Sequence, residues 1–356
     1  MPILNHQNHQ NHQNHQNHQN HQATENHQAG PDTGFTASVL GAARDGTVGY
    51  WDGSPDRSPK APRSALAALK AMAPDPRRAV IDQALAAPFG VTLASGSAAN
   101  RQGSVTLNGK TLVSLHAPTA PVLEKQLAFV RAAADLRGDR TGEIVMQTGD
   151  ILSFFALVGY MAPDATKWTL TLAHAISRLC VVLEMRLKHG FDVPRPIAFS
   201  TRLQPMIQTP GHGSWPSGHA TESFAMATIL SRLVLGETDP IASIAAGNPF
   251  FRHAARIAAN RTVAGVHFPT DSMAGAVLGI SLAEAVVRLC DRSSRLTRRS
   301  FDGTTFQEDF NLSVLSSELK DEKTVMTEVV SLDPETADGL FPVWMLEMWA
   351  EALKEW

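Results

Sequence analysis

Cationic, histidine and carboxylate residues recur in three short segments of the sequence, residues 188–196, 216–220 and 260–271. Two arginines and a lysine supply about three positive charges, enough to match a phosphoryl group of about −2. Two histidines, one of them followed closely by an aspartate, could supply a nucleophile and a general acid. The candidate residues are Lys188 and Arg195, then Ser217, Gly218 and His219, and finally Arg261, His267 and Asp271.

The second segment has the features of a helix start. Pro216 and Gly218 are poorly tolerated inside a helix, so we expect a helix to begin here with Ser217 as its N-cap. A helix N-terminus exposes N–H groups and a partial positive charge, which together can bind a phosphate-sized anion. His219 would lie in the first turn, beside that anion. Taken alone, the segment fits a capped helix with an incidental histidine equally well.

The third segment spans a predicted break between two helices. Arg261 lies near the end of the first helix, which we expect Gly265 to terminate, and Thr270 or Asp271 is expected to cap the second. Asp271 follows His267 by four residues, close enough to hold one ring nitrogen and so select the tautomer. Taken alone, a surface arginine and a capping aspartate explain this segment more simply.

The first segment leaves a long predicted helix. Lys188 lies near the C-terminus of that helix, and Arg195 follows in a loop made rigid by two prolines. A cation that compensates the helix dipole explains Lys188 on its own. Only the three segments together favour a pocket for an anionic group with two histidines beside it.

The order Lys-x6-Arg-Pro, Pro-Ser-Gly-His and Arg-x5-His-x3-Asp resembles the three-part signature of the type 2 phosphatidic acid phosphatase and vanadium haloperoxidase superfamily. The likeness is greatest to its soluble bacterial acid-phosphatase branch, and it covers residues 188–271. It implies a hydrolase of phosphoric monoesters, or of related phosphate esters, that acts through a phosphohistidine on a small substrate. One departure is Asn260, because the family usually has serine before the third-motif arginine.

The resemblance also implies a role for each candidate residue. His267 would attack phosphorus, and Asp271 would orient it. His219 would protonate the leaving group and then activate water. The phosphate oxygens would be held by Lys188, Arg195, Ser217, Gly218 and Arg261. No metal and no cofactor is expected for a phosphatase of this kind.

The main alternative is a vanadate-dependent haloperoxidase that oxidises halide with hydrogen peroxide. Vanadate would then be the cofactor and His267 its apical ligand. The compact spacing from His219 to Arg261 disfavours this reading, as does the lack of extra aromatic and acidic residues around the first motif.

A serine hydrolase built on Ser217 and His219 is disfavoured because residues two apart on a helix do not face each other. A divalent metal at His267 and Asp271 would be repelled by the neighbouring cations. A membrane-bound lipid phosphatase and a non-catalytic anion-binding module are further alternatives.

Composition and charge set broader limits. The 356 residues are 43% hydrophobic and 18% charged, typical of a folded globular protein. The formal net charge of −3 argues against charge-driven binding to nucleic acid. The longest apolar run, residues 272–283, is too short to span a membrane and is followed by Glu284, and no signal peptide is evident. We therefore expect a soluble, cytoplasmic protein without a transmembrane anchor. Cys180 and Cys290 are expected to be buried thiols.

The predicted fold class is all-α, a helical bundle of the acid phosphatase and haloperoxidase type with a small β-hairpin in the N-terminal part. Residues 104–115, with Asn108 and Gly109 at their centre, carry the hairpin signal. Four regions are expected: a disordered Asn-His-Gln repeat tail (1–30), an irregular and helical region with the hairpin (31–118), the catalytic bundle (119–291) and a polar excursion with a final helix (292–356). Helices are predicted at 119–137, 142–160, 165–189, 218–235, 250–264, 271–290 and 343–356. The apolar face of the last helix leaves room for a homo-oligomer.

Overall fold

The computed structural model describes residues 42–44, 46–47, 49, 52–94 and 101–356. The chain divides into two compact units, residues 1–77 and 78–356. The disorder predicted for residues 1–30 lies outside the described residues. In the first unit, helix α3 (Ala65–Ala71) begins after Ser64, whose hydroxyl accepts a hydrogen bond from the backbone N–H of Ala67. Helix α4 (Pro74–Ala86) runs from the first unit into the second.

The second unit is built around a long buried helix, α12 (Pro269–Cys290). Helix α9 (Gly218–Leu235) packs against it very closely, since a Cβ placed on Gly279 would lie 2.2 Å from the carbonyl oxygen of Thr221. A Cβ on Gly275 would lie 2.5 Å from the carbonyl oxygen of Ser217. These two glycines therefore let the second and third sequence motifs approach each other. The other helices are α5 (Ala120–Ala133), η1 (Ala134–Leu136), α6 (Arg137–Met146), α7 (Leu152–Gly159), α8 (Lys167–Phe191), η2 (Pro196–Ala198), η3 (Thr201–Leu203), α10 (Pro240–Ala245), α11 (Pro249–Val263), α13 (Leu312–Asp321), α14 (Pro334–Gly339) and α15 (Val343–Leu353).

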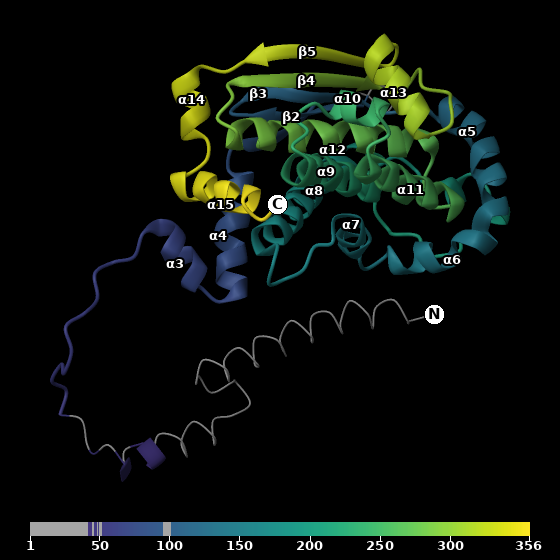
Figure 1. The fold of residues 1–356 in the computed structure, drawn as a ribbon. Coiled ribbons are helices and arrows are strands. Elements are labelled where there is room, and N and C mark those ends of the chain that lie inside the picture. The colour runs from purple at the N-terminus through teal and green to yellow at the C-terminus, as the bar shows by residue number, and fades with distance from the viewer. Residues whose placement is uncertain (1–41, 45, 48, 50–51, 95–100) are drawn as a thin grey trace. The chain divides into compact units, whose positions relative to one another are not determined.

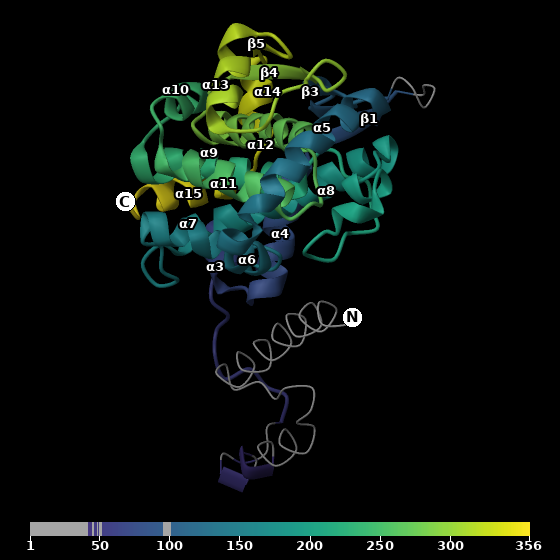
Figure 2. The ribbon, with the colours of Figure 1, turned by 90° about the vertical axis from the view of Figure 1, so that its right-hand side faces the viewer.

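A five-stranded sheet covers one side of these helices, with α12 directly beneath it (Figures 1 and 2). Its order along the sheet is β1-β2-β3-β4-β5, with β3 and β4 parallel and the other pairs antiparallel. The predicted hairpin is confirmed, because Asn108 and Gly109 join β2 to β3 with φ angles of 48° and 74°. The strands are β1 (Phe89–Leu93), β2 (Gln102–Leu107), β3 (Lys110–His116), β4 (Arg295–Asp302) and β5 (Val325–Ser331).

The prediction of an all-α fold is therefore wrong in part, and so is that of a polar excursion within residues 292–356, because β4 and β5 lie there. Strand β4 lies inside the sheet, with Phe301 buried on its inner face. The same inner face holds Arg299, which donates to Glu284 of α12 at 2.7 Å. A buried ion pair put an arginine where an alternating strand normally has an apolar residue, so the charged sequence concealed the strand.

Several predicted helix boundaries are confirmed and others are wrong. Ser217 caps α9, and Gly265 follows α11 with a φ of 79°. The single helix predicted at 119–137 is α5 followed by η1 and the first residue of α6, and the one predicted at 142–160 is the end of α6 followed by α7. Helix α12 starts at Pro269, with Phe268 as its N-cap, because proline suits the first helical position.

The apolar face of α15 is covered within the same chain. Helix α15 packs against α8, and Trp349 is buried. The indole N–H of Trp349 donates to Asp291 at 2.9 Å, and that of Trp356 donates to Thr169 at 3.0 Å. Most of this face is therefore covered within the chain, and Trp356 at its end is 41% exposed.

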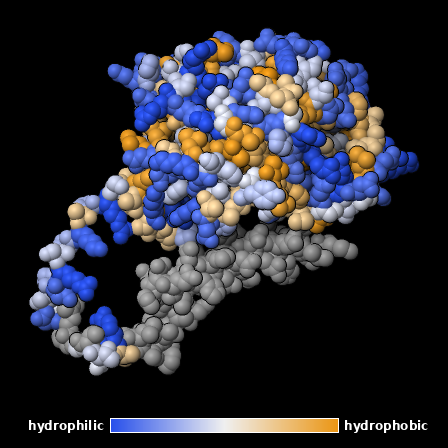
Figure 3. Space-filling model, in the orientation of Figure 1, coloured by the Kyte–Doolittle hydropathy of each residue, from blue (hydrophilic) through white to orange (hydrophobic). Residues whose placement is uncertain are grey.

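Among the described residues, α12 is the one helix long and apolar enough to cross a membrane by length and composition, with a mean hydropathy of 1.7 over its best window. Of that window, 94% is buried inside the protein. In the sequence, Glu284 marked the end of the apolar run. In the structure the helix continues past Glu284, which can be buried because it pairs with Arg299. Hydrophobic and hydrophilic residues are intermixed on the face of the molecule seen in Figure 3. Solubility and a cytoplasmic location stay predictions.

Candidate active site

Lys188 lies at the C-terminal end of α8 and is buried. Its ammonium donates to the carbonyl oxygens of Ser214, at 3.2 Å, and of Pro216. These carbonyls belong to the loop that leads into α9. Trp215 anchors the same loop, since its ring packs on Phe191 and Phe301 with centroid distances of 4.9 and 6.3 Å. The first motif therefore positions the second by hydrogen bonds to its backbone.

Arg195 donates hydrogen bonds to the loop before the second motif and to the third motif. Its Nε donates to the carbonyl oxygen of His212 at 3.1 Å, and its Nη1 donates to that of Val266 at 2.9 Å. The same Nη1 lies 3.3 Å from Nε2 of His267. His212 itself is exposed, and its Nδ1 lies 3.3 Å from Nη2 of Arg195. Arg195 thus reaches the reactive edge of His267 from the first motif.

His267 and Asp271 form a buried pair. Nδ1 of His267 lies 2.8 Å from Oδ2 of Asp271, and the same oxygen accepts the backbone N–H of Phe268 at 3.0 Å. Because a carboxylate only accepts, the proton is on Nδ1 and the lone pair is on Nε2. Burial, then the charges of Arg195 and Lys188, hold the pKa of His267 well below its usual range. His267 is therefore a neutral imidazole whose basic Nε2 faces Arg195.

His219 lies in the first turn of α9, as predicted. Its Nε2 donates to the carbonyl oxygen of Gln147 at 2.7 Å, because a carbonyl can only accept. Burial, followed by the positive charge of Arg261, lowers the pKa of His219 to about 3. A bound dianion would offset the positive charges and raise the pKa of His219 again. The ring can thus change its protonation state when an anion binds.

Arg261 is held by the end of α6. Its Nη2 donates to Oε1 of Gln147 at 2.8 Å, and to the carbonyl oxygen of Ile144 at 3.3 Å. Its Nε and Nη1 are buried and meet no hydrogen-bond partner among the described residues. Unpaired buried donors are costly unless a ligand or water satisfies them. Two guanidinium donors are therefore free to bind an anionic oxygen.

Asn260 takes the place of the usual serine and is fully buried. Its amide nitrogen donates to Oε1 of Gln147 at 3.0 Å and to Oε2 of Glu143 at 3.1 Å. Its oxygen accepts from Arg140 at 3.0 Å. Asn260 thus helps to fix Gln147, which in turn holds Arg261. The asparagine that replaces the usual serine is therefore held by hydrogen bonds to α6 and to the residue after it.

Ser217 and Gly218 stand at the N-terminus of α9. The hydroxyl of Ser217 caps the helix by accepting the backbone N–H of Ala220 at 3.5 Å. Gly218 has no room for a side chain, because a Cβ there would lie 2.5 Å from a carboxyl oxygen of Glu184. Glu184 is buried on α8 one turn before Lys188, and burial raises its pKa to about 8. A buried carboxyl therefore stands beside the proposed anion site.

The structure thus brings the candidate residues of all three motifs to one place. His267 feels the charges of Arg195, Lys188, His219 and Arg261. The backbone N–H of Ser217 donates to the carbonyl oxygen of Asp271 at 2.8 Å, which joins the second and third motifs directly. Gln147 is the residue that sequence reasoning missed. It lies outside the motifs, and only its neighbours in space reveal it.

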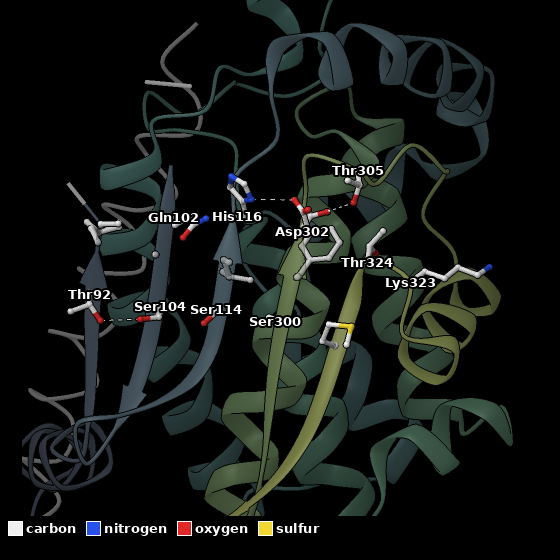
Figure 4. A pocket seen from close by; sticks show the side chains of 16 residues that line it. Thr92, Gln102, Ser104, Ser114, His116, Ser300, Asp302, Thr305, Lys323 and Thr324 are labelled. Atoms are coloured by element: carbon white, nitrogen blue, oxygen red, sulfur yellow. Dashed lines mark hydrogen bonds and ion pairs between the residues drawn. The ribbon is translucent and has the colours of Figure 1, made fainter. Parts of the chain in front are cut away.

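A cavity of about 720 Å³ lies elsewhere, over the outer face of the sheet. Side chains of Thr92, Ser104, Ser114 and Ser300 cross four strands there, and His116 and Asp302 lie beside this row (Figure 4). None of the candidate residues lines it. The motif cluster is the candidate active site, because histidines and buried cations meet there and not at the cavity on the sheet.

Comparison with known proteins agrees with the motifs. The family model of the PAP2 superfamily matches residues 166–295, which include all eight candidate residues. This match agrees with the resemblance that the three motifs indicated. No curated protein matches the chain. One similar solved structure is that of the first transmembrane PAP2 type phosphatidylglycerolphosphate phosphatase from Bacillus subtilis. It has 24% sequence identity and a TM-score of 0.36, over 49% of this chain and 87% of that chain.

Proposed function

We propose that the chain is a phosphate-ester hydrolase that acts on phosphoric monoesters, or on related esters, through a phosphohistidine. One observation carries the proposal. His267 presents an unprotonated Nε2, to which Nη1 of Arg195 donates at 3.3 Å, while Asp271 holds Nδ1 at 2.8 Å. A neutral imidazole oriented by a carboxylate, with a guanidinium beside its basic nitrogen, suits attack on an electrophilic phosphorus.

In the first step, Nε2 of His267 forms a bond to phosphorus as the bond to the ester oxygen breaks. The ring becomes positively charged, and Asp271 stabilises that charge through Nδ1–H. His219 gives a proton to the departing alkoxide, after the bound dianion has raised its pKa. The unpaired N–H groups of Arg261 and the N-terminus of α9 donate to the phosphoryl oxygens and so stabilise their negative charge.

In the second step, His219 removes a proton from water, which attacks the phosphorus and releases His267. Phosphate then leaves. Lys188 contributes its charge to the pocket, although its N–H groups are used by carbonyl oxygens of the loop before α9. We therefore assign Lys188 chiefly to positioning that loop and to the electrostatic field.

No cofactor is needed for this reaction. The alternative, a haloperoxidase, would use the same residues to hold vanadate, with Nε2 of His267 as the ligand. Assaying aryl-phosphate hydrolysis beside bromination by vanadate and peroxide separates the two. We expect hydrolysis and no bromination. Vanadate should inhibit hydrolysis and bind much more tightly than phosphate, because its five-coordinate form imitates the transition state. Bromination without hydrolysis would reject the phosphatase assignment.

A further inference from the structure

A second cluster of cations lies outside the catalytic cluster. Three arginines line a pocket of about 460 Å³ between α6 and α11, two helices that pack together. The α11 members recur at helical spacing and therefore share one face of that helix. The full lining is Arg140, Pro249, Arg252, His253, Arg256 and Ala259.

Positive charge is in excess in this pocket. Glu143 pairs with Arg256, whose Nε lies 2.8 Å from a carboxylate oxygen. Arg140 donates to the neutral amide of Asn260, and Arg252 has no carboxylate partner among the described residues. Burial lowers the pKa of His253, so that side chain is neutral near pH 7. Two guanidinium charges are therefore left without a matching anion.

The pocket shares a wall with the catalytic cluster. Arg140 donates to Oδ1 of Asn260 at 3.0 Å, and the amide nitrogen of Asn260 donates to Gln147 at 3.0 Å. Gln147 binds Arg261 through its side chain and His219 through its carbonyl oxygen. An unbroken chain of hydrogen bonds thus runs from the arginine pocket to two of the proposed catalytic groups.

We propose that this pocket binds a phosphate group, either free inorganic phosphate or the second phosphate of a substrate. Guanidinium groups pair well with phosphate oxygens, and a dianion matches the two unpaired charges. The lining offers only Pro249 and Ala259 as aliphatic surface, so a lipid chain has little to pack against. The second form of the proposal rests on the proposed hydrolase function, whereas the first does not.

Calorimetric titration of the full chain with inorganic phosphate, at constant ionic strength, tests the site directly. We expect two binding sites in the native chain and one in Arg252→Gln, or an affinity at the second site that is weaker by about tenfold or more. Arg131→Gln is the matched control, since Arg131 lies exposed on α5. Unchanged stoichiometry and affinity in Arg252→Gln would overturn the proposal.

Steady-state kinetics then identify the source of the phosphate. If it belongs to the substrate, Arg252→Gln should raise KM about tenfold for hexane-1,6-diol bisphosphate, whose two phosphates are separated by a six-carbon chain, and leave KM for p-nitrophenyl phosphate unchanged. If it is free phosphate, both KM values should stay the same while the second calorimetric site is lost. An equal rise in both KM values would overturn a separate site. A chain that hydrolyses neither compound rejects the proposed function, and the calorimetry still decides the pocket.

Discussion

Two His–Asp pairs of similar composition lie in very different surroundings. His267 and Asp271 are 2.8 Å apart, and their side chains are 6% and 0% exposed. His116 and Asp302 are 3.3 Å apart, at 28% and 42% exposure, on the outer face of the sheet (Figure 4). The first pair is surrounded by buried cations, whereas the second lies among serine and threonine hydroxyls.

The difference shows that the surroundings of a pair decide its chemistry more than its identity does. Asp302 also accepts the backbone N–H and the hydroxyl of Thr304, at 2.9 and 2.6 Å, so its carboxylate stabilises a turn. Asp271 instead accepts the backbone N–H of Phe268 and serves one partner ring, that of His267. Water screens the outer pair, and the low dielectric around the inner pair strengthens every charge effect.

The largest expected difference between the pairs is in turnover. His267→Ala should abolish hydrolysis of every phosphate ester, because it removes the nucleophile. His116→Ala should leave kcat and KM unchanged. Acid-quenched labelling with a radioactive phosphate ester should trap phosphoenzyme in the native chain and none in His267→Ala. Label that persists without His267 would remove that residue from the mechanism.

The second histidine of the inner cluster sharpens the comparison further. His219→Ala should slow hydrolysis of alkyl phosphates by about 10²–10⁴-fold, because a poor leaving group needs a proton in the transition state. It should slow release of nitrophenolate much less, since that leaving group needs little help. Phosphoenzyme should accumulate, because the base for the second step is gone. An equal loss on both substrates would show that His219 is not the acid.

The carboxylates should differ by a smaller factor. Asp271→Asn keeps the size of the side chain but can no longer stabilise a charged His267, so kcat should fall for all substrates alike, by about 10²-fold or more. Asp302→Asn should leave kcat unchanged and lower the unfolding midpoint slightly through the turn at Thr304. Rate measurements on aryl and alkyl phosphates check the first statement. A loss confined to alkyl phosphates would instead assign Asp271 to the leaving group.

The sequence allowed the inner pair to be predicted because its residues lie in short motifs at helix ends. Local rules of capping and termination place Ser217 and Gly265 correctly, and four residues separate His267 from Asp271. Such features depend on neighbours along the chain. The order of the motifs then added a specific family likeness.

The sheet and Gln147 could not be predicted, since both depend on contacts far apart in the sequence. In strand β4, Arg299 is buried because it pairs with Glu284 on α12. Gln147 contacts Asn260 and Arg261, more than 100 residues later in the chain. No local pattern marks either feature, because partners supplied by tertiary structure make polar residues tolerable inside a protein.

The smallest expected effect is on the pH dependence of the free energy of unfolding. The inner cluster should contribute to this dependence, whereas Asp302 of the outer pair should not. Burial raises the pKa of Glu184 to about 8 and that of Glu222, on α9, to about 7. In the unfolded chain both carboxyls ionise near their usual values, well below pH 6. Between pH 6.5 and 7.5 these two carboxyls therefore bind more protons in the folded state than in the unfolded state. The stability that these groups contribute is lost as the pH rises through their folded pKa values.

Urea unfolding at pH 6.5 and at pH 7.5 measures this loss. The free energy of unfolding should fall by up to about 1.4 kcal/mol per pH unit for each group that releases its proton on unfolding. The lowered pKa values of His219 and Lys188 act in the opposite direction, at the lower and the upper end of this window, so the native chain is compared with a variant at the same two pH values. Glu184→Gln stays neutral at both pH values and should reduce the fall, whereas Asp302→Asn should keep it. An unchanged slope in Glu184→Gln would mean that Glu184 is ionised in the folded protein, paired with Lys188 one helical turn away.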